Sequence, residues 1–349
     1  MTEENIATVN ARPRIRLQNE LRPELNSSLL DMRINLPLSG MANAEVRFVN
    51  WRSNSADGDA DFAFQTIEHG NRLEILAGDS DADPLFSGEI TAIEERYGEG
   101  APQLVLLAED LLHHLARIRH NRVFEDMSLD DVITSLVRDL GLENDIQVSQ
   151  LQSTWHQMNE SNLAFIARLL APYDVSLRID NGRLRAKAEE PDAQPEPLHA
   201  QNNIQHLRIA ADLNHQPTRA QVKGFDLGTD ADSDSENDDF PGASDTKATD
   251  MLQDLSWGQT EIFPQPFART QMEAQDWAKG RFHQKAKRFL YGDILCSGIA
   301  GMRVGREVEL QGVSQRLQGK YQVVDCQHCF DAQRGYITHL KVQRGGWSG

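Results

Sequence analysis

Apolar and polar residues alternate along residues 301–344 with the period of two that is typical of β-strands. In the last stretch one face is formed by Tyr336, Thr338, Leu340 and Val342, and the residues between them form the other. Glycines stand between the apolar stretches or at their edges, where a turn needs a positive φ or two backbones approach closely. The pattern predicts an antiparallel meander of three strands, at residues 307–310, 320–324 and 336–342.

The same pattern occurs near the other end of the chain. Residues 70–75 and 305–310 both read glycine, two polar residues, apolar, acidic, apolar. A second glycine then opens a strand in each segment, at residues 88–93 and 319–324, and a third strand follows at 103–108 and 336–342. Alternating strands with glycine turns are common in unrelated β proteins, so a chance likeness is an alternative. If the repeat is real, the chain contains two copies of one β domain.

A chain of 349 residues is too long for one typical domain. Residues 1–118 are predicted to form the first β domain, and residues 119–200 a small α+β insert with a linker. In the insert Ser128 and Asp131 have capping-box spacing, helices are expected near 132–140 and 163–170, and Asn181-Gly182 suits a type I′ hairpin turn. Residues 201–349 are predicted to form the second β domain, with an acidic loop at 226–256 and a helix at 267–289 that buries Ala274, Trp277, Ala278 and Phe282. The predicted fold class is mainly β with an α+β insert.

Half of the net charge lies in one segment. The chain carries −18, and residues 226–254 contribute −9 through ten acids and one lysine. This segment has almost no large apolar side chains to offset the entropy of ordering, so it is predicted to be an exposed, mobile loop. The acidic balance argues against binding to nucleic acid or anionic membranes. No apolar run approaches the roughly 20 residues of a membrane helix, and no signal peptide is visible, so synthesis in the cytoplasm without membrane insertion is expected.

Two motifs resemble metal sites but lack essential ligands. Cys326 and Cys329 have the spacing of half a zinc site, yet the only further cysteine is Cys296, and a strand turns residues i and i+3 to opposite faces. They are interpreted as small buried hydrophobes. The acidic run before Ser235 imitates the start of an EF-hand, but Ser235 replaces the required glycine and Pro241 the required glutamate. Neither motif predicts a metal site.

Motifs of known catalytic centres are also missing. The histidines, including His113, His114, His156, His283 and His328, form no His-x-x-x-His pair and no Glu-x-x-His set, and no P-loop, Gly-x-Gly-x-x-Gly or Gly-x-Ser-x-Gly motif occurs. No carboxylate pair is marked out among the 53 acids. One basic run could contact phosphate, although a charged helix end explains it better; it consists of Lys279, Arg281, Lys285, Lys287 and Arg288. The chain is predicted to have no catalytic, cofactor or metal site and not to be an enzyme.

A family resemblance is carried by an ordered set of segments. The first part contains Leu-Ser-Gly-Met-Ala-Asn-Ala-Glu-Val at 38–46, Phe-Ser-Gly-Glu-Ile-Thr-Ala-Ile-Glu at 86–94 and Ala-Glu-Asp-Leu-Leu-His-His-Leu at 108–115. The middle adds residues 119–124, Met-Ser-Leu-Asp-Asp-Val at 127–132 and Asn-Glu-Ser-Asn-Leu-Ala-Phe at 159–165. The end adds Gly-Met-Arg-Val-Gly at 301–305, Leu-Gln-Gly-Lys-Tyr-Gln-Val at 317–323 and Gly-Tyr-Ile-Thr at 335–338. In this order they resemble the hub proteins of contractile injection systems, namely the late control D proteins of phage tails and the N-terminal half of VgrG spike proteins.

The resemblance implies two tube-protein-like β-barrel or split-barrel domains and a small LysM-like α+β domain. It also implies a homotrimer that forms a pseudo-sixfold ring, a structural baseplate hub between a hexameric inner tube and a trimeric spike, with baseplate wedge proteins as further partners. No OB-fold or β-helix follows the hub before residue 349, so a separate spike protein is expected, and the chain would be incorporated into a phage tail or contractile injection particle. The alternative is a baseplate component that binds or degrades cell-wall peptidoglycan through the LysM-like insert.

Overall fold

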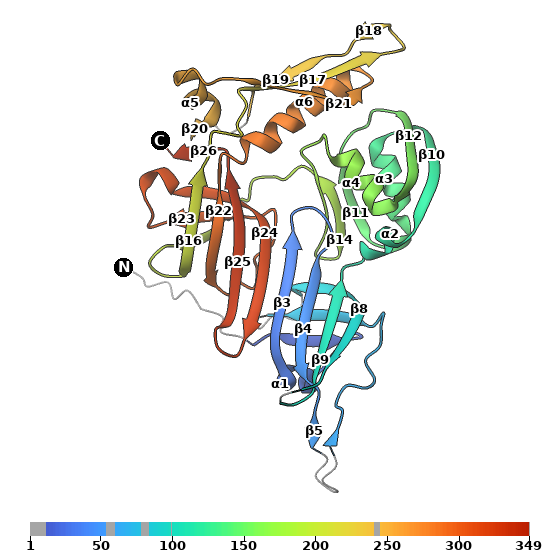
Figure 1. The fold of residues 1–349 in the computed structure, drawn as a ribbon, viewed down its shortest axis with the longest axis vertical. Helices are drawn as coiled ribbons and strands as arrows, with labels where there is room; N and C mark the ends of the chain where they lie inside the picture. Colours follow the sequence, from blue (N-terminus) through green and yellow to red (C-terminus); the bar gives the residue numbers. More distant parts are fainter. Residues whose placement is uncertain (1–11, 54–59, 78–83, 99, 241–244, 349) are drawn as a thin grey trace.

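A single large sheet organises the computed structural model, which describes residues 12–53, 60–77, 84–98, 100–240 and 245–348. The sheet has 13 strands and includes the path β16-β22-β25-β24-β3-β4-β9-β8-β7-β1-β2. Figure 1 shows strands from the two ends of the chain side by side in it, with red β24 next to blue β3. Most of the regular structure is β, so the predicted fold class is confirmed.

The first β unit supplies the blue and cyan part of this sheet (Figure 1). One of its strands ends at Pro37, and a short helix follows its last strand after residue 110. Ile34, Val46 and Phe48 are fully buried on the core side, in agreement with the period of two. Its elements are β1 (Arg14–Leu17), β2 (Glu20–Leu21), α1 (Pro23–Ser28), β3 (Leu29–Pro37), β4 (Asn43–Val49), β5 (Arg52–Ser53), β6 (Ala60–Asp61), β7 (Arg72–Leu76), β8 (Phe86–Arg96) and β9 (Gln103–Glu109).

The middle unit combines helices with short strands, and both predicted helices are present in it. The Ser128 hydroxyl accepts from the Asp131 N–H at 3.1 Å, which caps the first, and the predicted hairpin turns at Asn181 and Gly182 with positive φ. The pair β10 and β12 was not predicted, because its mostly polar residues alternate too weakly. The elements are α2 (His113–Arg117), β10 (Arg119–Met127), α3 (Leu129–Val137), η1 (Arg138–Leu140), β11 (Glu143–Gln147), β12 (Ser153–Ser161), α4 (Asn162–Leu170), β13 (Ser176–Asp180) and β14 (Arg183–Lys187).

The second β unit contains the predicted meander of three strands. It is formed by β23, β24 and β25, and in β25 the predicted face with Tyr336, Thr338, Leu340 and Val342 is buried. The strand β24 is longer than predicted, because it continues past Val324 to Asp331. The elements are β15 (Glu196–His199), β16 (Ile204–Ala211), β22 (Leu290–Ser297), β23 (Glu307–Gln311), η2 (Gln315–Leu317), β24 (Gly319–Asp331), β25 (Gly335–Arg344) and β26 (Gly346–Ser348).

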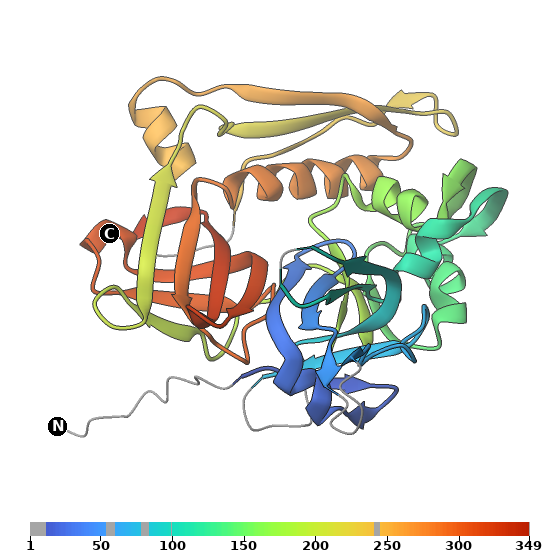
Figure 2. The same cartoon turned by 60° about the horizontal axis from the view of Figure 1, so that its bottom comes forward.

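An arm leaves the second unit between β16 and β22. Figure 2 shows it as a layer in which helix α6 lies between the arm strands and the rest of the molecule. The helix is shorter than the predicted 267–289, because β21 extends to Ala268 and Thr270 caps α6, but its predicted apolar face is buried. None of the described helices is long and apolar enough to cross a membrane. The elements are β17 (Arg219–Asp226), β18 (Ala231–Asp232), β19 (Ser235–Asn237), β20 (Asp245–Lys247), α5 (Ala248–Asp254), β21 (Thr260–Ala268) and α6 (Gln271–Ala286).

The prediction of a mobile acidic loop at 226–256 is wrong for most of that segment, of which residues 241–244 lie outside the described residues. It contains β18, β19, β20 and α5. Three of its acids pair with cations of β17, since Lys223 pairs with Asp234 and Arg219 lies 2.8 Å from Glu236 and 3.4 Å from Asp238. The few apolar residues are used as well, for Leu252 is buried in α5. Strand pairing with β17, cross-strand ion pairs and burial of Leu252 together accompany the regular structure of a segment that its composition marks as unstructured.

Candidate functional site

The two β units have the same strand order, and this duplication defines the candidate site. Across the sheet the first unit reads β1-β7-β8-β9-β4-β3, and the second reads β15-β23-β24-β25-β22-β16. The predicted sequence repeat at residues 70–75 and 305–310 falls at the start of β7 and β23, so these strands correspond. The outermost pair differs in direction, because β1 is antiparallel to β7 whereas β15 is parallel to β23.

The correspondence extends to single hydrogen bonds and irregularities. The Gly70 N–H donates to the Ile90 carbonyl at 2.8 Å, and the Gly305 N–H donates to the Val323 carbonyl at 2.8 Å. Directly after these positions, β8 and β24 each carry a bulge against the next strand, between Ile90 and Ala92 and between Val323 and Asp325. A second pair of bulges lies at the start of β3 and of β16. Residues of β8 and β24, and of β3 and β16, therefore have defined counterparts.

The structure corrects one part of the predicted repeat. Gly88 does not correspond to Gly319, because Gly88 faces Leu73 of β7 whereas Tyr321 faces the equivalent Val308 of β23. The shift is two residues, which keeps every side chain on its predicted face. The two glycines also serve different purposes. A Cβ at Gly88 would come within 2.2 Å of the Glu109 carbonyl oxygen, whereas Gly319 has a φ of +120°.

The two units are joined through the second half of β24. Its first half pairs with β23, and from Asp325 to Asp331 the same edge pairs antiparallel with β3 of the first unit. We call this pairing the internal joint. The side of the joint that faces the core is buried, since Ile34 and His328 lie opposite each other and neither side chain is exposed. On the other face the amide of Gln327 donates to Asn35 at 2.6 Å.

His328 is held neutral inside the internal joint. The Tyr336 hydroxyl lies 2.8 Å from Nδ1, and the Met302 carbonyl lies 3.2 Å from Nε2. Burial, with a smaller effect of the Arg303 charge, lowers the pKa of His328 to about 3. Burial also raises the pKa of the neighbouring Cys326 thiol above its usual range. The predicted interpretation of Cys326 as a small buried hydrophobe agrees with this position, and Cys329 on the opposite face is half-buried.

The second joint that the duplication implies is not made within the chain. The counterpart of β3 is β16, and the counterpart of the second half of β24 is the second half of β8. Among the described residues β16 pairs with β22 alone, and β8 from Thr91 onward pairs with β9 alone. Figure 1 shows β16 at the left of the second β unit and β8 at the right of the first β unit, on opposite sides of the large sheet. Both edges are therefore open to a partner.

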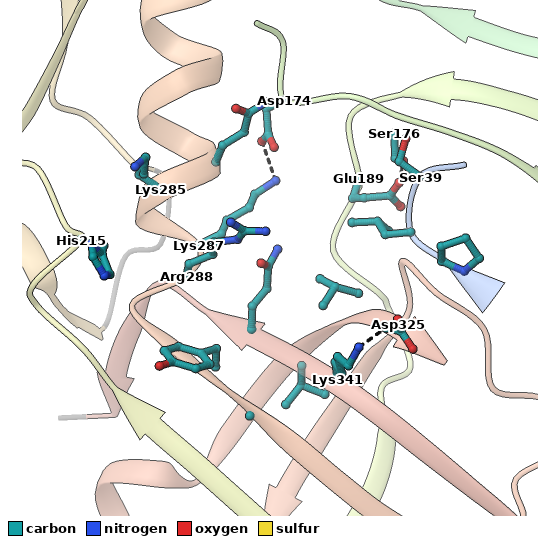
Figure 3. Close-up of a pocket in the computed structure, with 18 of the residues that line it drawn as sticks. Ser39, Asp174, Ser176, Glu189, His215, Lys285, Lys287, Arg288, Asp325 and Lys341 are labelled. Atoms are coloured by element: carbon teal, nitrogen blue, oxygen red, sulfur yellow. Dashed lines mark hydrogen bonds and ion pairs between the residues drawn. The ribbon is translucent and has the colours of Figure 1, made fainter. Parts of the chain in front are cut away.

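A cavity of about 860 Å³ lies between α6, the middle unit and the second β unit (Figure 3). It gathers cations from the predicted basic run, but several of them are paired inside the protein. Lys287 pairs with Asp174, and Lys341 lies 3.3 Å from Asp325. Elsewhere in the same run, Lys285 lies 3.2 Å from Glu261, and the Arg281 guanidinium stacks over the ring of Phe263. The basic run fixes α6 in the fold. Among the lining residues the Ser176 hydroxyl donates to the Glu189 carboxylate, which is already held by Arg178.

A cluster that the sequence analysis missed lies where α2 meets β8. Nε2 of His113 and Nε2 of His114 lie 3.0 and 2.9 Å from the same carboxylate oxygen of Glu89. Among the described residues these three form the one group of His, Cys, Asp and Glu whose ligand atoms could share a metal ion. The acids before Ser235 do not form such a group. The signal was weak because Glu89 lies 24 residues before His113, with no fixed motif spacing.

The fold is that of phage tail proteins. The 43 kDa tail protein of prophage MuSo2 from Shewanella oneidensis superposes with a TM-score of 0.70 at 13% identity, over 96% of this chain and 98% of that one. A tail protein from Neisseria meningitidis MC58 superposes with a TM-score of 0.69 at 11% identity, over 96% of this chain and 97% of that one. The E. coli c3393 protein, described as a component of the type VI secretion system with structural similarity to the T4 tail proteins gp27 and gp5, gives 0.60 at 12% identity, over 92% and 76%.

The sequence itself was compared with curated proteins and with protein families. No curated protein matches the chain. One family model does match, over residues 30–331, and its description is Alg8 N-terminal domain. The match begins in β3 and ends at the last residue of β24, so it includes both strands of the internal joint. Because it spans most of the 349 residues, the chain belongs to the Alg8 N-terminal domain family.

Proposed function

We propose that the protein is the structural hub of a contractile injection machine, a homotrimer whose six β units form a ring between a sixfold inner tube and a separate threefold spike. The observation that carries the proposal is the duplicated sheet with its internal joint. The likeness to tail proteins and to a type VI secretion component supports it, as does the sequence resemblance to hub proteins.

The duplication supports a ring because it offers six similar surfaces from three chains. A sixfold tube cannot contact a threefold spike through equivalent contacts on both sides. A chain with two alike units solves this problem, since three copies present six alike units toward the tube and three identical middle units and arms elsewhere. Wedge proteins would contact the outside of the same ring. In this proposal residues 1–118 form the first tube-like unit, residues 119–200 form the LysM-like insert with its linker, and residues 201–349 form the second tube-like unit.

The test is the oligomeric state of the purified full chain. We expect light scattering after size exclusion to give three times 39.2 kDa for the chain alone, or a complex with its spike and tube proteins that contains three copies of the chain. Negative-stain class averages are expected to show a threefold particle with a sixfold rim. A chain that stays monomeric alone and with both partners would contradict the hub. Binding to peptidoglycan, or release of fragments from it, would instead favour the alternative of a wall-active baseplate component.

A further inference from the structure

We infer that β16 of one chain pairs with the second half of β8 of a second copy, in the register of the internal joint. This inference rests on the proposed ring and names the surface that closes it. The internal joint is a complete example of the contact within the same chain, with β3 on β24. The two unused edges, on β16 and β8, are the counterparts of those two strands.

The register follows from the equivalence of the two units. Ile34 faces Ala44 of β4, and Ile209 faces the equivalent Gly292 of β22, so Ile209 takes the place of Ile34. In β8, Ala92 takes the place of Asp325, because each is the first paired residue after its bulge. The pairs of the internal joint can now be transferred to these two edges. Residues of β8 then lie opposite residues of β16 in the neighbouring chain as follows: Ile93 opposite Ala211, Glu94 opposite Ala210, Glu95 opposite Ile209, Arg96 opposite Arg208 and Tyr97 opposite Leu207.

Burial of the two edges agrees with this assignment. In the internal joint Met32 and Ile34 are 2% and 0% exposed. Their counterparts Leu207 and Ile209 have the same apolar character but are only half-buried, against the same core. Opposite them Tyr97 is 62% exposed, an unusual position for a large aromatic ring. Pairing of the two edges would cover the Tyr97 ring with Leu207. Glu95 would then be the polar residue on the core side of the pairing, where the Tyr97 hydroxyl already contacts its carboxylate.

The other face of the pairing is polar and largely complementary. Glu94 and Arg208 of the neighbouring chain are diagonal neighbours in the inferred register, within reach of a long side chain. Arg96 lies directly opposite Arg208, but each arginine has an acid in its own chain, since Arg96 lies 2.8 Å from Glu94 and Arg208 lies 3.8 Å from Asp293. No net positive charge is therefore brought into the contact.

A second copy of this chain is the occupant that fits both edges at once. The two edges lie on opposite sides of one molecule (Figure 1), so they cannot pair within a chain. A head-to-tail contact between identical chains uses both edges of every copy when it closes into a ring. Three copies then have three internal joints and three joints between chains.

The register can be tested by cysteine pairing in the full-length chain. The pair Glu94→Cys with Ala210→Cys occupies the counterparts of Gln327 and Asn35, whose side chains touch in the internal joint. We expect oxidation to give linked dimers and trimers on a non-reducing gel. The matched control Glu95→Cys with Ala210→Cys places the two cysteines on opposite faces, and the wild-type chain keeps its own three cysteines. Both are expected to stay unlinked.

The outcome separates this inference from the hub itself. A trimer by light scattering whose Glu94→Cys, Ala210→Cys form does not link would overturn the register and leave the ring standing. Linking of the Glu95→Cys control to the same extent would also overturn it, because it would place the strands one residue out of register. A chain that forms no trimer at all contradicts the hub and the joint together.

A second inference rests on a different observation and does not need the ring. We propose that Glu89, His113 and His114 bind one Zn²⁺ ion per chain. Imidazole nitrogens and carboxylate oxygens are the ligands that zinc accepts, with three protein ligands and water in an open site. His113 is buried and fixes one ligand, whereas Glu89 and His114 are partly exposed and leave room for water.

The distances and charges of the cluster fit a cation. Zinc–ligand distances of about 2.0–2.2 Å place two ligand atoms on one ion roughly 3–3.5 Å apart. The two Nε2 atoms lie 3.0 and 2.9 Å from the Glu89 oxygen, and all three ligand atoms lie within 4.8 Å of one another. Glu89 also faces Glu109 across the strands, a repulsive pair that a cation would relieve, while its other neighbour Arg72 is paired with Glu74 at 2.7 Å. The ion would fasten α2, where the middle unit begins, to β8.

Zinc titration of the chelator-treated full chain by calorimetry tests this site. We expect one Zn²⁺ per chain. His114→Ala is expected to bind zinc at least about 10-fold more weakly, because losing even a residue that only supports a metal ligand lowers metal affinity by about 10-fold or more. His156→Ala removes an exposed histidine of β12 and is expected to change nothing. His114→Cys replaces the ligand by another zinc ligand and should restore binding, which a mere hydrogen bond to Glu89 would not. Absence of binding, or equal losses in His156→Ala and His114→Ala, would overturn the site.

Discussion

Arg178→Met is expected to lower the free energy of unfolding by about 3–5 kcal/mol, the cost of removing one partner of a buried ion pair. In the wild type the Arg178 guanidinium donates to both oxygens of Glu189, at 2.5 and 3.1 Å, and only 5% and 6% of the two side chains are exposed. The variant leaves a buried carboxylate with Ser176 and the more distant Arg185, at 3.5 Å. Urea denaturation at neutral pH, followed by circular dichroism, measures the loss.

The double variant Arg178→Met, Glu189→Leu separates charge from packing. Because both deeply buried charges are removed together, and Asp180 and Arg185, which each lose a partner, are partly exposed, it is expected to recover most of the loss. A double variant as unstable as Arg178→Met would show that the methionine itself does not fit. The pair also has a pH signature. Burial alone would raise the pKa of Glu189, but the Arg178 hydrogen bonds and charge lower it below the usual value. The stability it contributes is therefore complete above the usual glutamate range and is lost as the pH falls through the lowered pKa.

Acid is expected to loosen the internal joint through His328. Burial lowers the pKa of this imidazole to about 3, whereas it is about 6.5 in an unfolded chain. Between these values the unfolded chain binds a proton that the folded chain does not, so stability is complete above pH 6.5 and falls as the pH drops toward 3. The loss from this group amounts to at most about 5 kcal/mol, at 1.36 kcal/mol for each pKa unit. Unfolding free energies measured in steps from pH 7 to pH 4 should show it.

His328→Gln isolates this contribution from that of the many carboxylates. Glutamine can donate to the Met302 carbonyl and accept from the Tyr336 hydroxyl, but it does not titrate. The variant is expected to lose less stability than the wild type between pH 6.5 and pH 4. His215→Gln replaces an exposed histidine and should keep the wild-type profile. Identical profiles for His328→Gln and the wild type would contradict a buried neutral His328.

Much of the local structure could be predicted from the sequence, because it depends on neighbouring residues. The alternation in β25 identifies its buried face, Ser128 caps α3, and Asn181-Gly182 turns the hairpin. The sequence also indicated a duplication, with a chance likeness as the alternative, but it matched Gly88 with Gly319. A slip of two residues keeps every side chain on the same face, so the alternation of apolar and polar residues does not reveal it. The two glycines also have different roles, because Gly88 allows a close approach of backbones and Gly319 has a positive φ.

The predictions failed where long-range contacts order polar segments. Lys223 and Arg219 of β17 neutralise acids of the segment that composition marks as mobile. The strands β10 and β12 are ordered mainly by each other, with few apolar residues to mark them. The candidate zinc ligands belong to the same class, because Glu89 and His113 meet only after β8 and α2 have packed together.

The sequence by itself determined the strands of the meander, the face that the last of them buries and the cap of α3, and it indicated two related β units. Only the tertiary structure decided that β3 pairs with β24 and that β16 and the end of β8 stay open. The physical reason lies in the backbone. Every strand edge offers the same row of N–H and C=O groups, so its own residues do not specify which distant edge it joins. That choice is made by the packing of side chains such as Ile34 against His328, which lie far apart in the chain.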